Sequence, residues 1–471
     1  MAMTQTPLAR AEHPVPTTYC DKDELRTSFA LAMSTMYQHE VPAYGTLIDL
    51  VREVNDEVAT SETFSITERL HLERHGAIRL GTAHELQTVR RIFALIGLYP
   101  VDYYDLSVAG LPMHATAFRP VNAVALGKNP FRVFTTLLRP ELLSAETREV
   151  ALKLLRQRQI FSRKLLELIE IGESQGGLTA AQGEIFVLEA IRTFRWQTVA
   201  GASREEYQML KTEHPILADI VCFNTAHINH LTPRVLDIGL AEHRMKAAEL
   251  NVKSSIEGPP ARKIPILLRQ TSFLAFEEDI EFPTDNGELI AASHTARFGE
   301  IEERGAALTS KGRSLYDEVL AKGIEARGIG GNQGYSSAFK AFPDQLDELL
   351  AQGLIFCTFK VVGSADTPGS VARGSDTVTS LMAKGKLIAS PITYEDFLPF
   401  SAAGIFRSNL GDGHHQDGMP VSLPAGNQAS LEQALGCSVL SSEKLYAAEQ
   451  AKSLEDCARR LGLQEIRLAC R

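Results

Sequence analysis

The chain has 471 residues, of which 44% are hydrophobic, so it is long enough to bury a large core in one or several domains. Its net charge of -10 and its pI of about 5.8 argue against binding to nucleic acid or to anionic membrane surfaces. We therefore expect a small-molecule substrate, and an anionic substrate would need local arginines.

The cysteines and the N-terminus bear on where the protein works. The six cysteines show no Cys-x-x-Cys pair, which is typical of reduced thiols in a reducing compartment. Residues 1–20 lack the apolar stretch of a secretory signal, and no apolar run approaches the about twenty residues that span a bilayer. We expect a flexible N-terminus over residues 1–20 and a soluble, cytoplasmic catalytic domain over residues 21–471.

The first part of the chain predicts two helices and then a compact module. Apolar residues recur at helical spacing over about residues 23–38 and 43–58. A first module over about residues 67–140 would begin with a strand around His75, followed by a helix that Thr82 and Glu85 open as a capping box. Three strands are predicted to complete it, at residues 101–106, 114–119 and 131–138.

A helical insertion is predicted over about residues 141–222, followed by a second module over about residues 223–305. The second module repeats the element order of the first, without any repeat of the residues themselves. Two such modules would pair their sheets around a shared cavity. The predicted elements of the second module are a strand at 228–235, a helix at 240–250 and strands at 264–276, 288–293 and 295–302.

The remainder of the chain, about residues 306–471, is predicted to be a mainly helical elaboration. A helix over 310–326 precedes a glycine-rich stretch at 328–334. That stretch follows a helix instead of a strand, so it predicts a loop and not a dinucleotide-binding site.

His75 and Arg79 form the first pair of candidate site residues. They are four residues apart, so they point to the same side of the chain in either a strand or a helix. A metal at His75 and a guanidinium at Arg79 could hold the two ends of a dicarboxylate. The alternatives are a structural histidine and a surface ion pair.

The second candidate is a histidine in the β-prone stretch that ends at Val235. His227 and His230 have an odd spacing, so they face opposite sides of a strand and at most one can be a ligand. His230 shares its face with Thr232 and is favoured, which leaves His227 as a residue that could orient the ligand.

The third candidate is Glu300, in a charged stretch that also contains His294, Glu302 and Glu303. Glu300 is the middle one of three residues that share a face of a strand, which favours it. A solvated charged edge and His294 remain alternatives.

Two histidines and one carboxylate would leave coordination positions open for chemistry on a bound metal. His75, His230 and Glu300 form such a set. His414 and His415 lie in a stretch rich in glycine and aspartate, and we expect them to face solvent.

Four segments carry a resemblance to the 2-oxoadipate dioxygenase/decarboxylase family, which is related to the vicinal oxygen chelate superfamily. The resemblance spans nearly the whole chain. The segments are His75-Gly76-Ala77-Ile78-Arg79-Leu80-Gly81-Thr82, Asn229-His230-Leu231-Thr232-Pro233-Arg234, Arg297-Phe298-Gly299-Glu300-Ile301-Glu302-Glu303-Arg304-Gly305 and Leu398-Pro399-Phe400-Ser401-Ala402-Ala403-Gly404-Ile405-Phe406.

This resemblance implies an α+β fold in which βαβββ modules form a central mixed or antiparallel sheet around a metal site, with large helical insertions. It implies that Fe(II) is held by His75, His230 and Glu300, and it favours His230 over His227. Arg79 would be the catalytic residue that binds the substrate, and Phe400 and Ser401 would line the substrate pocket.

The implied reaction converts 2-oxoadipate and O2 into 2-hydroxyglutarate and CO2, a step of lysine breakdown. The expected partners are therefore a 2-oxo dicarboxylic acid and O2, with no nucleic acid and no membrane. Two alternatives remain: a zinc or manganese lyase or isomerase on the same scaffold, since the same ligands suit zinc, and a non-catalytic protein that binds dicarboxylates.

Overall fold

A mixed five-stranded sheet in the order β2-β3-β4-β1-β5 lies at the centre of the protein. The computed structural model describes residues 18–59, 69–253, 256–284, 286–363, 374–398 and 427–468. β1 pairs with β4 in parallel, and the other neighbours in this sheet pair antiparallel. The strands and the helix between the first two are β1 (Arg74–Leu80), α4 (Ala83–Leu95), β2 (Tyr99–Asp105), β3 (Met113–Arg119), β4 (Arg132–Leu138) and β5 (Leu231–Pro233).

The strand, helix and three strands follow one another in the order that the sequence predicted for residues 67–140. The predicted capping box is also present, because Thr82 Oγ1 accepts from the Glu85 amide and the Glu85 carboxylate accepts from the Thr82 amide. β1 ends at Leu80, directly after Arg79, and the cap starts α4 at Ala83. The mixed α+β class is therefore confirmed.

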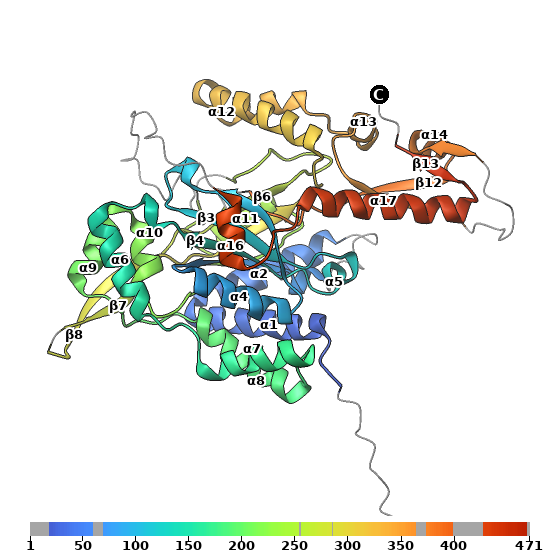
Figure 1. Ribbon diagram of the computed structural model, residues 1–471. Coiled ribbons are helices and arrows are strands. Elements are labelled where there is room, and N and C mark those ends of the chain that lie inside the picture. The colour runs from blue at the N-terminus through green and yellow to red at the C-terminus, as the bar shows by residue number, and fades with distance from the viewer. Residues whose placement is uncertain are drawn as a thin grey trace, which may run out of the picture.

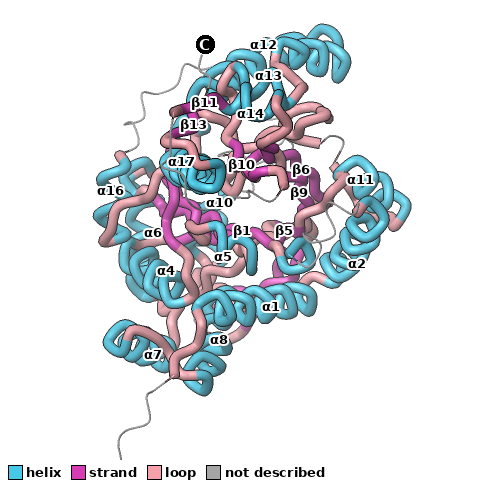
Figure 2. Tube along the Cα trace, turned by 90° about the vertical axis from the view of Figure 1, so that its right-hand side faces the viewer, coloured by secondary structure: helices cyan, strands magenta, loops and turns pink. Residues whose placement is uncertain are grey.

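Helices cover one face of the sheet. Side chains that point from β1, β3 and β4 to this face, such as Ile78, Phe118 and Val133, join Phe29 and Phe93 in one large core. Figure 2 shows α1, α4 and α8 side by side below the strands. The helices of the N-terminal part and of the predicted insertion are α1 (Lys22–Glu40), α2 (Pro42–Val58), α6 (Ala145–Gln157), α7 (Arg163–Gln175), α8 (Ala180–Phe194), α9 (Arg204–Glu213) and α10 (Pro215–Val221).

The second half of the sheet layer differs from the predicted module. The strand expected over 264–276 is the shorter β6, which pairs with β9, and an additional strand, β7, follows it and pairs with β8. β7 was not predicted because its outward positions are acidic, which hides the inward pair Ile280 and Phe282. The elements are α11 (Ile238–Ala247), β6 (Leu268–Ser272), β7 (Glu277–Pro283), β8 (Leu289–Thr295) and β9 (Glu300–Arg304).

β9 continues the layer beyond β5. The amide of Val235 donates to the carbonyl of Glu302, and Arg234 and Glu302 form a parallel bridge. In Figure 2 the strands β1, β5, β9 and β6 form a curved row, with α2 and α11 packed together outside it. The curvature turns side chains of β1 and β9 toward one another.

The C-terminal part forms a core of its own, around Tyr316, Phe339 and Phe359. In Figure 1 the long helix α17 lies below β12 and β13, and α12 lies at the top. The elements are α12 (Ser310–Ala338), α13 (Leu346–Ala351), β10 (Cys357–Val361), β11 (Ser375–Thr377), α14 (Val378–Ala383), β12 (Leu387–Pro391), α16 (Gln428–Leu435), α17 (Ser442–Leu461) and β13 (Glu465–Arg467).

The glycine-rich stretch at 328–334 is not the predicted loop. α12 runs through it and is kinked at Gly331, where φ is 58°. Glycine tolerates this left-handed backbone, so one residue absorbs the kink while the flanking residues stay helical.

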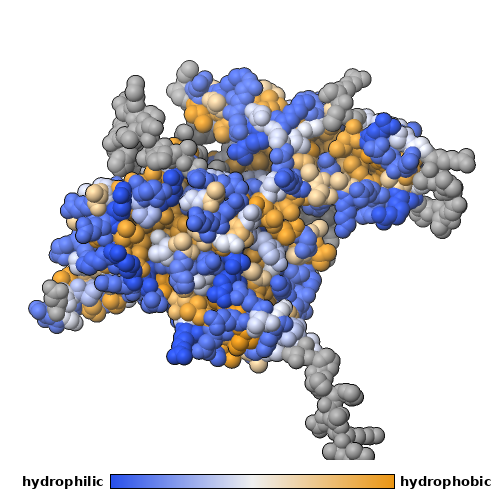
Figure 3. All heavy atoms as spheres, in the orientation of Figure 1, coloured by the Kyte–Doolittle hydropathy of each residue, from blue (hydrophilic) through white to orange (hydrophobic). Residues whose placement is uncertain are grey.

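The face of the protein in Figure 3 is mostly hydrophilic, with hydrophobic residues scattered among the polar ones. None of the helices in the described parts of the chain is long and apolar enough to cross a membrane.

Candidate metal centre

Three predicted residues meet at one buried point. The Nε2 atom of His75 lies 3.1 Å from Oε2 of Glu300, and Nε2 of His230 lies 3.8 Å from the same oxygen. One ligand atom from each of the three residues lies within 4.8 Å of the other two. All three side chains are fully buried. The structure thus brings together the three residues that the sequence analysis selected as a set.

Strand pairing explains how residues so distant in the sequence meet. His75 of β1 stands opposite Thr232 of β5, two residues after His230. β9 adjoins β5, and Thr232 Oγ1 donates to Oε2 of Glu300 over 2.8 Å. His75 therefore lies on β1, Glu300 lies on β9, and His230 directly precedes β5, the strand between them.

The donor set fits a metal ion. Among the described residues, no hydrogen bond satisfies either ring nitrogen of His75 or of His230, or Oε1 of Glu300. Buried polar atoms without partners are rare and costly in folded proteins. The other oxygen of Glu300 is held by Thr232 and by Gln270 Nε2 at 3.0 Å, which fixes the carboxylate in place.

Glu302 orients His75 from behind. Its Oε1 lies 3.1 Å from Nδ1 of His75 and 2.7 Å from Nε of Arg304. Burial opposes ionisation of Glu302, yet Arg304 and His75 hold its pKa below the usual range. A charged Glu302 keeps the proton of His75 on Nδ1, which presents the lone pair of Nε2 to the centre.

The pKa values of the two histidines are shifted in opposite directions. Burial by itself would lower the pKa of His75, but Glu302 and Glu300 raise it above its ordinary value. Burial lowers the pKa of His230 well below its ordinary value, and neighbouring His75 adds to the effect. His230 is therefore neutral, as a metal ligand must be.

Aromatic rings enclose the centre. Phe298 stacks on His230 with ring centroids 4.8 Å apart, and Phe397 meets His75 edge to face at 5.1 Å. Both phenylalanines are buried. These rings exclude water from two sides of the histidine pair.

Arg79 lies on the same face of β1 as His75, as predicted, and its guanidinium reaches Asp219. Nη1 of Arg79 is 2.5 Å from Oδ2 of Asp219, and the other oxygen, Oδ1, lies 2.9 Å from Nε2 of His227. Nε2 of His294 lies 3.2 Å from the same carboxylate. His227 and His294, the two histidines left open by the sequence, therefore contact Asp219 and not the three clustered side chains.

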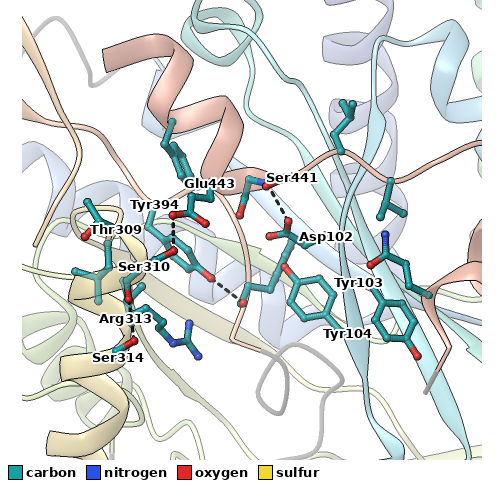
Figure 4. Close-up of a pocket in the computed structure, with 18 residues that line it drawn as sticks. Asp102, Tyr103, Tyr104, Thr309, Ser310, Arg313, Ser314, Tyr394, Ser441 and Glu443 are labelled. Carbon is teal, nitrogen blue, oxygen red and sulfur yellow. Dashed lines mark hydrogen bonds between the residues drawn. The ribbon is translucent and has the colours of Figure 1, made fainter. Parts of the chain in front are cut away.

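Phe397 is also one of the residues that line a pocket of about 680 Å³. Figure 4 shows Asp102, Tyr394 and Ser441 around it, and the Tyr394 hydroxyl donates to the carbonyl of Phe397. Phe397 also packs on His75, so it contacts both this pocket and a side chain of the metal centre.

Two residues of this region were not predicted from the sequence. Glu302 was only an alternative to Glu300, and Asp219 was not among the candidates. Asp219 had a readable signal, because it is the one acidic residue in α10, where every other residue is apolar. The predicted pocket residues Phe400 and Ser401, and the predicted solvent-facing His414 and His415, lie outside the described residues.

Comparisons with known proteins identify the family. A family model described as 2-oxoadipate dioxygenase/decarboxylase matches residues 29–409. A protein of that name from Pseudomonas putida is 46% identical over 468 residues, which cover 94% of this chain and 98% of that protein. Another from Shigella flexneri is 46% identical over 445 residues, covering 92% of this chain and 98% of that protein.

A solved structure agrees with these matches. The hydroxyglutarate synthase from Pseudomonas putida in complex with 2-oxoadipate superposes with a TM-score of 0.83 and 42% sequence identity, covering 94% of this chain and 99% of that chain. The resemblance seen in the sequence motifs is thereby confirmed. The chain belongs to the 2-oxoadipate dioxygenase/decarboxylase family.

Proposed function

We propose that this protein is an Fe(II)-dependent enzyme that converts 2-oxoadipate and O2 into 2-hydroxyglutarate and CO2 in lysine breakdown. The observation that carries the proposal is the buried set of His75, His230 and Glu300 in a chain of this family. Two histidines and one carboxylate are the ligand type of non-haem Fe(II) oxygenases.

The reaction needs no other reactant. All atoms of 2-oxoadipate and O2 are found in 2-hydroxyglutarate and CO2, so the electrons for reducing O2 come from the substrate. Ferrous iron, when bound, would supply open coordination positions and the redox chemistry that lets a 2-oxo acid react with O2. The remaining tasks are binding, orientation and the exclusion of water.

The surrounding side chains suit these tasks. His75 and His230 hold the metal where the 2-oxo carboxylate end of the substrate would lie, and Glu302 holds the His75 proton on Nδ1. Arg79 would bind the distal carboxylate and so orient the carbon chain. Phe298 and Phe397 keep water from the histidines, and we assign Phe400 and Ser401 to the substrate pocket as the sequence motif indicates.

The proposed fold relationship follows the same reasoning. We infer that the β1-α4-β2-β3-β4 unit is a vicinal-oxygen-chelate-type module. We also infer that β5, α11, β6 and β9 derive from a second one with β7 and β8 as an added hairpin. In support, the ligand residues belong to both units: His75 lies on β1, and Glu300 lies on β9.

Oxygen uptake tests the function. Metal-free protein reconstituted anaerobically with Fe(II) should consume O2 only when 2-oxoadipate is added, and should form 2-hydroxyglutarate and CO2 in equal amounts. His230→Ala and Glu300→Ala should lose both bound iron and uptake, because each removes one of three ligands. Full activity in either variant contradicts the proposed site.

The same assay separates the alternatives. A zinc or manganese lyase would change the substrate without O2 uptake, and a non-catalytic binder would form no product. Either result with iron bound at stoichiometric occupancy would refute the oxygenase.

A further inference from the structure

Asp219 is a buried carboxylate that the proposed chemistry does not yet use. It lies in α10 and is 6% exposed, and the other residues of this helix are apolar and buried except for the proline at its start. α10 packs against β1, the strand that carries His75 and Arg79. A charge in such a position is costly unless it is fully paired, so its partners explain why it is there.

The hydrogen bonds of Asp219 use its whole capacity. Oδ1 accepts a hydrogen bond from Nε2 of His227 at 2.9 Å and lies 3.2 Å from Nε2 of His294. Oδ2 accepts hydrogen bonds from Nη1 of Arg79 at 2.5 Å and from Nδ2 of Asn229 at 3.2 Å. A carboxylate has about four acceptor sites, so four donors fill it and hold it in one orientation.

The neighbouring groups fix the protonation of this cluster. The Tyr207 hydroxyl lies 2.9 Å from Nδ1 of His294, so it can donate to that nitrogen while Nε2 keeps its proton for Asp219. Burial lowers the pKa of His227, which makes it a neutral donor. Burial opposes ionisation of Asp219, yet His227 and Arg79 hold its pKa well below the usual range.

The cluster is tied to the metal centre by covalent and backbone links. Asn229 directly precedes His230, and its amide donates to the carbonyl of Ala77, between His75 and Arg79 on β1. Asp219 therefore contacts the side chains of both segments that approach the metal centre. The separation between the metal ligands and the guanidinium is fixed as a consequence.

We propose that Asp219 is the positioning residue that fixes Arg79 as the receptor for the distal carboxylate of the substrate, and so selects 2-oxo dicarboxylic acids over 2-oxo monocarboxylic acids. This inference rests on the proposed function and deepens it. Asp219 also offsets the charge of Arg79, so a carboxylate is recognised by the fixed geometry of the guanidinium more than by excess charge.

The test compares substrates in the iron-loaded enzyme. The probes are 2-oxoadipate and 2-oxohexanoate, which has the same chain length and no distal carboxylate. Asp219→Asn should lower the preference in kcat/KM for 2-oxoadipate about tenfold or more, mainly through KM. The reason is that an amide holds the guanidinium of Arg79, which binds the distal carboxylate, less firmly than a carboxylate does. Turnover of 2-oxohexanoate and the bound iron should stay within about twofold of wild type, which a general loss of structure would not allow.

A double-mutant cycle shows whether Asp219 acts through Arg79. Arg79→Met should lose the same preference, and Arg79→Met/Asp219→Asn should lose no more than Arg79→Met alone. Glu205→Gln, an exposed acid on the neighbouring helix α9, is the matched control and should keep the wild-type preference.

Two further measurements keep the inference open to refutation. If Asp219→Asn does not fold, His227→Leu removes one donor from Oδ1 and should lower the preference at least about threefold. If wild-type protein turns over no substrate, the proposed function fails, and the same comparison is made by calorimetric binding of the two acids. An unchanged preference in the Asp219 or His227 variant, by turnover or by binding, overturns the inference.

Discussion

At the scale of single residues, the two ring nitrogens of His75 have different tasks. Nδ1 faces Glu302 and Nε2 faces Glu300, so the ring is held between an orienting carboxylate and the carboxylate of a proposed ligand. Glu302 is in turn held by Arg304. Partners of this kind set the tautomer and the basicity of a metal-binding histidine.

Glu302→Gln tests this arrangement. We expect iron affinity to fall about tenfold, within the range found for outer partners of metal ligands, because the amide no longer stabilises the proton on Nδ1. Competition with a chelator of known affinity measures the change. Glu303→Gln is the control, since Glu303 lies one residue on and pairs with Arg269 instead. Equal losses in both variants would show that the effect is not specific to His75.

At the scale of secondary structure, the close approach of two segments aligns the ligands. Gly76 follows His75 on β1, and a Cβ atom there would lie 2.5 Å from Ile228 Cδ1 and 2.9 Å from the carbonyl oxygen of His230. Only glycine allows the backbone of the His230 segment to come so near to β1.

Gly76→Ala should therefore push the two histidines apart. We expect a loss of about 1–3 kcal/mol in the free energy of unfolding, typical of an overpacked core, and a lower iron affinity. Urea denaturation and metal titration measure the two effects. Gly127→Ala lies in α5 (Ala123–Lys128), where an added Cβ meets nothing within 4 Å, so neither quantity should fall. Unchanged iron affinity in Gly76→Ala would contradict the alignment.

At the scale of the whole molecule, a buried ionic network joins distant parts of the chain. Arg132 of β4 pairs with Glu73, just before β1, at 2.8 Å and also with Glu395, which follows β12. Arg69 bonds to both glutamates. Burial opposes ionisation of Glu395, but Arg132 and Arg69 hold its pKa below the usual range. The network thus attaches the C-terminal part of the chain to the central sheet.

Arg132→Met should lower the free energy of unfolding at pH 7 by about 3–5 kcal/mol, because it leaves two buried carboxylates short of positive charge. The wild-type carboxylates have lowered pKa values, so their contribution is present above the unfolded pKa of about 4.3 and is lost as the pH falls through the folded values. In the variant they take up protons more readily. The difference between wild type and variant should therefore shrink as the pH falls from 7 toward 4.

Urea denaturation at several pH values measures this trend. The exposed Arg156 on α6 provides the control, since Arg156→Met should change the free energy of unfolding by no more than about 0.5 kcal/mol at any of these values. A difference for Arg132→Met that stays constant with pH would show that lost packing, and not buried charge, causes it.

The sequence by itself indicated most element types and the proposed ligand set. Hydrophobic periodicity and capping residues act within one turn or one strand, so α1, α2, β1 to β4 and the Thr82 cap could be predicted. The motifs around His75, His230 and Glu300 were sufficient to recognise the family. Where a local pattern was misleading, as in acidic β7 or the glycines of α12, the prediction was wrong.

Only the tertiary structure decided the partners of these residues. Arg79, His227 and His294 converge on Asp219, and Glu302 contacts His75, although long stretches of chain separate Asp219 from Arg79 and His294, and Glu302 from His75. No periodicity records such contacts, because they depend on which strands become neighbours and on how the layer curves. Local chemistry therefore indicated which residues bind, whereas packing between distant segments decided what holds them in place.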